Sequence, residues 1–248
     1  MTTLAQLDQA LRPLQSVDDQ GFYPRYLFRG QSKHYGRIPP LIARKPSQPA
    51  IKQLYRMFSD ASLFASGIGG YHVGRRDGIG LFQHYGLPTP FLDFSGCIDV
   101  AIFFALLTAK PGDQAVIYVL DRSLIPAEAV CFELEFFCLP LNEGGHRHRH
   151  LRQDAFVLGP THFDSPPAAA DFDPLKPSFG KALTPHFFDV HAGDKAEIAD
   201  IMSLIGDPIP HHIVNLIHLW AEQRLDEPLH EDLAACLNEM LAYTGGNA

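Results

Sequence analysis

The stretch QHYGLPTPFLDFSGCIDVAIFFA, Gln83–Ala105, carries the strongest structural pattern in this chain. Its first half is polar and then irregular, because Gly86 permits positive φ while Pro88 and Pro90 each fix φ and remove an N–H donor. Its second half is almost wholly apolar, which predicts a buried helix over 98–108. A rigid polar loop that leads into a buried helix is a common way to present a functional site.

A second motif lies upstream, where a strand-like apolar run ends in Phe28-Arg29-Gly30-Gln31. An arginine beside a glycine, which lets backbone or ligand approach closely, suits bidentate binding of a phosphate or another anion. The alternative is a structural ion pair between Arg29 and a carboxylate such as Asp93. The apolar residues next to each should pair in one core, so we expect Arg29 and Asp93 to be near neighbours.

Together the two motifs resemble the FRG domain, a family named for its Phe-Arg-Gly motif. The resemblance covers roughly 26–158 and includes a weaker third block, Arg149–Phe156. Pro90 and Ala155 stand where the family usually has a basic residue and a glycine. The order of an early arginine, a serine-bearing loop feeding an apolar helix, and a late Gln or Glu is also similar to the ADP-ribosyltransferase layout.

The pattern of elements, with this resemblance, predicts an α+β fold. We expect a single mixed or antiparallel sheet core with flanking helices, ADP-ribosyltransferase-like, followed by a helical C-terminal region. The expected domains are an FRG-type core over 1–190 and a helical cap over 191–248, packed on that core. The segment 67–80 holds six glycines and is expected to be bent or mobile. The expected helices are 4–14, 51–63, 79–85, 98–108, 195–204, 212–224 and 231–241, and the expected strands are 21–28, 115–120, 130–137, 155–158 and 183–190.

Composition limits the function classes. The chain has 248 residues, is 46% hydrophobic and 19% charged, and carries a formal net charge of −8. These values are ordinary for a globular protein and do not favour nucleic-acid binding. No apolar run approaches the roughly 20 residues of a membrane span, and no signal peptide is recognisable, so we expect a cytoplasmic protein. The four cysteines have no paired short spacing, so we expect neither a disulfide framework nor a metal site.

The resemblance implies a pocket for a small nucleotide ligand, with NAD as the cofactor. In that pocket Arg29 and Gln31 would hold the pyrophosphate and ribose, and Tyr85 with His84 would contact the nicotinamide end. Asp93 and Ser95 would orient Arg29. The candidate catalytic residues are therefore Arg29, His84, Tyr85, Asp93 and Gln153, and the candidate cofactor-binding residues are Phe28, Gly30, Gln31, Thr89, Ser95, Glu135 and Arg149.

The leading hypothesis is an ADP-ribosyltransferase-like or NAD-consuming effector of bacterial defence or toxin systems, with a protein partner bound through the C-terminal helices. One alternative is a module that senses a nucleotide or a nucleic acid without turnover. Another is a metal-dependent nuclease that uses His84, Asp93 and the histidine-rich loop His146–His150. The sequence feature that discriminates the first two is the third motif, where Gln153 stands in place of a certain catalytic carboxylate.

Overall fold

A six-stranded sheet forms the centre of the protein, and all its neighbouring strands are antiparallel. A computed structural model describes residues 2–15, 24–44, 47–69, 74–84, 86–134, 154–163, 171–197, 211–225 and 227–245. The strand order is β4-β5-β2-β1-β3-β6. The strands are β1 Tyr26–Gln31, β2 Leu92–Ser95, β3 Gln114–Asp121, β4 Ala129–Glu133, β5 Ala155–Pro160 and β6 Leu183–Asp189. The expectation of an α+β protein with a single sheet is confirmed.

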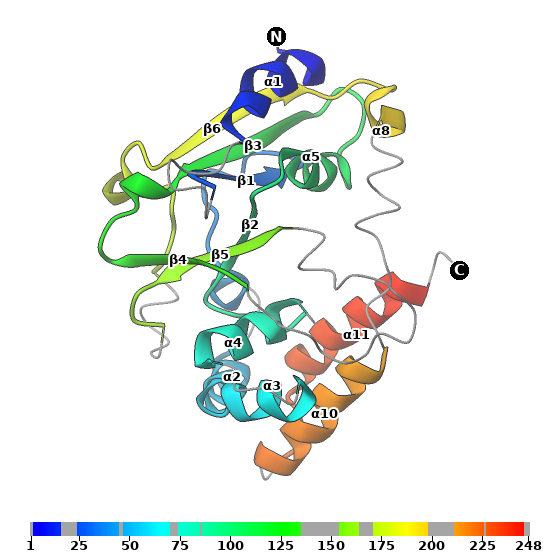
Figure 1. Cartoon of the computed structure of the whole chain (residues 1–248). Coiled ribbons are helices and arrows are strands. Elements are labelled where there is room, and N and C mark those ends of the chain that lie inside the picture. Colours follow the sequence, from blue (N-terminus) through cyan, green and yellow to red (C-terminus); the bar gives the residue numbers. More distant parts are fainter. Residues whose placement is uncertain are drawn as a thin grey trace.

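The helices gather in two groups, as Figure 1 shows. One group covers β1, β3 and β6, and the other lies beyond the β2 and β5 side of the sheet. The α-helices are α1 Leu4–Leu11, α2 Gln48–Ser59, α3 Ala61–Gly69, α4 Arg75–His84, α5 Ile98–Leu106, α8 Asp194–Glu197, α10 His211–Leu225 and α11 Glu231–Gly245, with 3-10 turns at 12–14, 41–43, 122–124 and 177–179. Among the described residues, no helix is both long and apolar enough to span a bilayer.

Alternation along β1 divides the core between the two faces of the sheet. Phe28 packs with α1 and α5, whereas its neighbour Leu27 packs on the opposite face with Phe172 and Phe179. Each of these side chains is buried, and burial of a large apolar side chain contributes roughly 1.5–3 kcal/mol. The central strand therefore joins two layers of core, as the period of its apolar residues requires.

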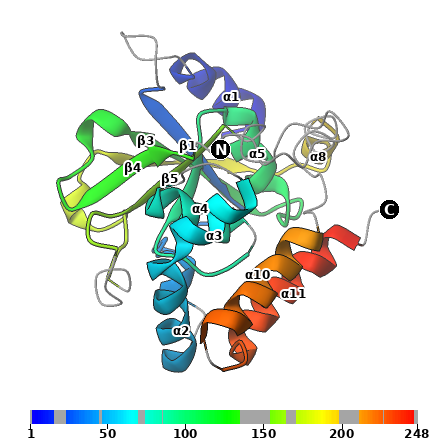
Figure 2. The same cartoon turned by 60° about the horizontal axis from the view of Figure 1, so that its bottom comes forward.

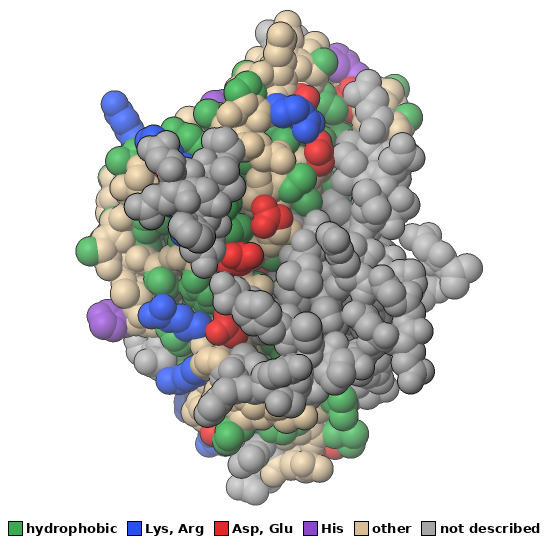
Figure 3. All heavy atoms as spheres, in the orientation of Figure 1, with side chains coloured by type: hydrophobic (Ala, Val, Ile, Leu, Met, Phe, Trp, Pro, Cys, Tyr) green, Lys and Arg blue, Asp and Glu red, His purple; other side chains and the backbone are tan. Residues whose placement is uncertain are grey.

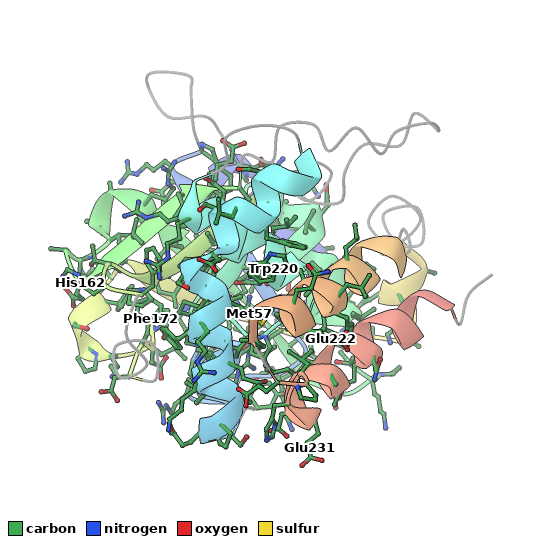
Figure 4. All side chains as sticks on the ribbon, turned by 90° about the horizontal axis from the view of Figure 1, so that it is seen from below. Met57, His162, Phe172, Trp220, Glu222 and Glu231 are labelled. Atoms are coloured by element: carbon green, nitrogen blue, oxygen red, sulfur yellow. The ribbon has the colours of Figure 1, made fainter. Side chains whose placement is uncertain are left out.

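The second helical group has its own core. Residues of α2, α3, α4, α10 and α11 form one buried cluster that also reaches Val157 of β5. In Figure 4, Trp220 points from α10 toward α3 and α4, and its ring contacts Phe64 and Phe82 at centroid distances of 5.0 and 5.6 Å. Helix α10 of the C-terminal region thus packs on α3 and α4. The proposed division into 1–190 and 191–248 stays a prediction.

Glycine explains why α5 lies so close to β1. A Cβ atom on Gly30 would fall 1.7 Å from the carbonyl oxygen of Ala101 and 2.7 Å from the amide nitrogen of Ala105. A residue with a Cβ atom cannot be accommodated at these distances. The packing of α5 on β1 therefore requires the glycine of the motif. The predicted buried helix is present, and it ends at Leu106.

Most of the described part of the glycine-rich segment is helical, and residues 70–73 between the two helices lie outside the described residues. α3 continues to Gly69 and α4 begins at Arg75. A Cβ atom on Gly78 would lie 2.4 Å from the carbonyl oxygen of Ala61, so α4 approaches α3 more closely than any other residue would allow. Gly78 therefore serves helix packing, which overrides its low intrinsic helix propensity.

Candidate functional site

Strands β1 and β2 separate at the end where the motif residues lie. Phe28 and Ser95 are their paired residues, whereas β1 pairs with β3 along its whole length. A cavity of about 390 Å³ lies at this split. The first strand begins later than expected and runs to Gln31, so Arg29 lies within the strand beside the split.

The cavity is built from segments that are far apart in the sequence. β1 and β2 line it together with Val100, Ala101 and Phe104 of α5 and the 3-10 turn before Arg44. The loop after α4 contributes Gly86 and Leu87, and α11 contributes Cys236 and Glu239. Figure 2 shows α5, α4 and α11 around the sheet from below.

Arg29 bridges the split through its side chain. Its Nη1 donates a hydrogen bond to the carbonyl oxygen of Asp93 at 2.6 Å. The expectation that Arg29 and Asp93 are neighbours is confirmed, but the contact is to the backbone of Asp93. The guanidinium therefore satisfies an acceptor of β2 where β1 has moved away.

The rest of the Arg29 guanidinium has little compensation within the protein. Its Nε is buried without a hydrogen-bond partner among the described residues, and none of their carboxylates lies within ion-pair distance of it. Burial lowers the pKa of Arg29, the charge of Asp93 opposes that shift, and the charge of Arg44 adds to it. Arginine stays protonated even so, and the site therefore holds a buried positive charge.

Arg44 supplies a second cation. Its side chain is exposed and lines the cavity, and it makes no hydrogen bond or ion pair with the described part of the chain. The protein atoms around it lower its pKa by burial, while the charge of Asp93 acts in the opposite direction. Arg29 and Arg44 thus present two guanidinium groups to one cavity.

A short hydrogen-bond chain holds the carboxylate of Asp93. Gln83 donates from Nε2 to Asp93 Oδ1 and accepts at Oε1 from the hydroxyl of Thr89. Glu239 is the second carboxylate among the described residues that line the cavity. The lining therefore combines two cations, two anions and an apolar wall.

The structure brings together many of the residues that the sequence singles out. Phe28, Arg29, Gly30, Asp93 and Ser95 all line the cavity. The hydroxyl of Ser95 accepts a hydrogen bond from the backbone N–H of Cys97 at 2.9 Å, just before α5. These placements agree with a shared site and leave the individual roles as predictions.

Two predicted residues, Gln31 and Thr89, are not among the residues that line the cavity. Gln31 ends β1, and its Oε1 is buried without a partner among the described residues. Thr89 is buried at 1% exposure and bonds to Gln83. The remaining predicted positions lie outside the described residues: the side chain of His84, Tyr85, Glu135, Arg149 and Gln153, as well as the loop His146–His150.

Sequence reasoning did not select Arg44, Gln83, Cys236 or Glu239 as site residues. Gln83 is the first residue of the stretch Gln83–Ala105, so its polar character was a usable signal, whereas Arg44 lies 13 residues beyond Gln31. Cys236 and Glu239 are three residues apart on one face of α11, and only tertiary packing brings that face to the cavity. Among the described residues, no group of His, Cys, Asp and Glu side chains could hold a metal ion.

The fold and the cavity define an α+β protein whose antiparallel sheet splits around an arginine-lined cavity. Residues 24–114 match the family model of the FRG domain, so this chain carries an FRG domain. No curated protein and no solved structure matches the chain significantly. The matched segment includes β1, β2 and α5, whereas Ala155, Cys236 and Glu239 complete the cavity from beyond it.

Proposed function

We propose that the cavity binds the phosphate groups of a nucleotide, that this nucleotide is NAD, and that the protein cleaves it in an ADP-ribosyltransferase-like reaction. The observation that carries the proposal is the guanidinium of Arg29, which lines the cavity beside Arg44 without a carboxylate partner among the described residues. A buried charge without a counter-charge is unfavourable by several kcal/mol. A phosphate or pyrophosphate between the two arginines supplies that counter-charge with bidentate geometry.

The remaining lining suits the other parts of such a ligand. Phe28, Leu41 and Phe104 give the cavity an apolar wall on which a flat ring can pack. A volume of about 390 Å³ falls at the lower end of the range for small-molecule sites, roughly 300–1,000 Å³. The cavity therefore fits one part of a dinucleotide, with the other part extending past Arg44.

The two lining carboxylates supply the chemistry that cleavage needs. When the bond between ribose C1′ and the nicotinamide nitrogen breaks, its electron pair leaves with nicotinamide and positive charge develops on the ribose. Asp93 or Glu239 stabilises that charge. A hydroxyl group of the acceptor or of water then bonds to ribose C1′ and gives its proton to a carboxylate or to another water molecule. The setting in bacterial defence or toxin systems rests on the family resemblance.

Surface charge favours a small ligand over nucleic acid. The net charge is −8. On the face in Figure 3, Lys and Arg side chains of the described residues are interspersed with Asp and Glu. A nucleic-acid site is expected to show a continuous basic stripe.

Calorimetry with NAD tests the proposal on wild type, Arg29→Ala and the control Arg56→Ala. Arg56 is an exposed arginine paired with Glu227, away from the cavity. We expect saturable heats for wild type and Arg56→Ala and none for Arg29→Ala. Equal heats for all three, or no heat from wild type, would overturn NAD binding. If the protein also releases nicotinamide from NAD, it is an enzyme. If it binds NAD without releasing nicotinamide, it is the sensing module without turnover.

A further inference from the structure

A chain of three hydrogen bonds fixes the direction in which Gln83 points. The backbone N–H of Phe91 donates to Thr89 Oγ1 at 3.3 Å, which leaves the hydroxyl proton free to donate to Gln83 Oε1. Because that oxygen is engaged, the amide group must turn its NH₂ toward Asp93, where it donates to Oδ1. Thr89 is almost wholly buried, so this anchor is held by the core.

The carboxylate that Gln83 holds lies close to both arginines. Burial lowers the pKa of Arg29 and of Arg44 and the charge of Asp93 opposes that shift, yet neither guanidinium forms an ion pair with a carboxylate of the described residues. Two cations near one carboxylate would ordinarily attract it into a salt bridge. Besides Asp93, the charged groups of the described residues that line the cavity are Arg29, Arg44 and Glu239.

We propose that Gln83 is a positioning residue that holds the Asp93 carboxylate away from Arg29 and Arg44 and so keeps the anion site open. Without the amide, Asp93 turns toward a guanidinium and occupies the place of the ligand phosphate. This inference rests on the proposed function, because it takes a phosphate group as the anion. It assigns Gln83 an indirect role, in which the residue acts through Asp93.

Removal and rescue test this role. We expect Gln83→Ala to weaken binding of NAD and of inorganic pyrophosphate about tenfold, which corresponds to the loss of one well-placed hydrogen bond. In the double variant Gln83→Ala/Asp93→Asn, no carboxylate remains to compete for the arginines, so binding should return to within about twofold of the Asp93→Asn single variant. Unchanged binding in Gln83→Ala, or no rescue in the double variant, would overturn the proposal.

A test without ligand separates this inference from the proposed function. Gln83→Glu puts a second carboxyl group against Asp93, and the repulsion should raise the pKa of one of them above its unfolded value of about 4. A raised folded pKa stabilises the protein at low pH, and this contribution is lost as pH rises through that pKa.

We therefore expect the melting temperature of Gln83→Glu to fall further below that of wild type at pH 8 than at pH 5. Parallel pH profiles would show that the two side chains do not interact, whatever the ligand. If wild type binds pyrophosphate but not NAD, the NAD proposal fails while the role of Gln83 is decided with pyrophosphate. If neither binds, the proposed function fails and the melting profiles decide.

Discussion

Arg29 serves stability and ligand binding through different nitrogen atoms. Nη1 donates a hydrogen bond to the Asp93 carbonyl oxygen and so bridges the split between β1 and β2. Nε has no hydrogen-bond partner among the described residues. The side chain of Arg44 lines the same cavity and makes no hydrogen bond or ion pair with the described residues. Removal of Arg29 and removal of Arg44 should therefore have different effects on stability and on anion binding.

Arg29→Ala should lose both stability and anion binding, whereas Arg44→Ala should lose binding alone. Removal of Nη1 leaves a backbone acceptor unsatisfied, at a cost of about 1–3 kcal/mol. Loss of the exposed Arg44 side chain should change stability by no more than about 0.5 kcal/mol. Urea unfolding and calorimetry on the same samples measure both quantities. Equal unfolding midpoints for the two variants would contradict this division.

The side chain of Asp93 should contribute less to stability than it would if it formed an ion pair with Arg29. A buried salt bridge between Arg29 and Asp93 was the alternative that the sequence left open, and its loss would cost roughly 3–5 kcal/mol. In the structure the hydrogen bond from Arg29 goes to the backbone oxygen, which every residue has, and Asp93 is exposed.

We therefore expect Asp93→Ala to melt close to wild type and well above Arg29→Ala, while nicotinamide release falls if Asp93 is the carboxylate that stabilises the ribose. Thermal melts of the three proteins measure the first effect. A melting temperature for Asp93→Ala as low as that of Arg29→Ala would show that the side chain itself is structural.

Among the elements, the contact between β1 and α5 depends most on a single position. Gly30→Ala would drive a methyl group into the α5 backbone at Ala101. Backbone cannot move aside as a side chain can, so we expect a loss of several kcal/mol and a distorted cavity. Gly67→Ala is the matched control, because nothing lies within 4 Å of its Cβ and alanine is the better helix former by roughly 0.5–1 kcal/mol. Chemical unfolding should show opposite signs for the two; equal effects would contradict the packing argument.

Local patterns predicted the long, periodic elements well. The apolar run at 98–108 became α5, and the run at 115–120 became β3, Gln114–Asp121. The start of α4 at Arg75 was not predicted, because Gly78 lets α4 approach α3 at Ala61 and this reason depends on a partner distant in sequence. The expected helix at 51–63 became α2 and α3, with the break at Asp60. Periodicity reports which face is buried and does not report where one helix stops and the next begins.

In the whole molecule, the candidate site combines residues of the segment that matches the FRG domain with residues of α11, which is far from it in sequence. The match to the FRG domain ends at residue 114, but α11 reaches the cavity with Cys236 and Glu239. The motifs predicted which residues of β1 and β2 converge. They could not predict the contribution of α11, because nothing in the local pattern of that helix distinguishes a cavity-lining face from a core-facing one. The expected protein partner of the C-terminal helices stays a prediction; Leu216 and Leu219 of α10 are exposed.

The C-terminal helices should be required for ligand binding as well as for stability. Leu237 of α11 is fully buried in the core shared with α2 and α10, so Leu237→Ala should cost about 2–5 kcal/mol. It should also weaken NAD binding, because Glu239 loses its support. Leu219→Ala is the control, since this side chain is 54% exposed. Denaturant titration and calorimetry test both; NAD affinity that is unchanged in folded Leu237→Ala would contradict a role for α11 at the site.

We propose above all that Arg29 and Arg44 hold a phosphate group in the cavity at the split between β1 and β2. A crystal structure of the protein with ADP-ribose, which carries the pyrophosphate and ribose without the cleavable bond, tests this most directly. We expect phosphate oxygens within hydrogen-bond distance of both guanidinium groups, with Gln83 still bonded to Asp93. A ligand bound elsewhere, or an empty cavity in which Asp93 pairs with Arg29 or Arg44, would contradict it.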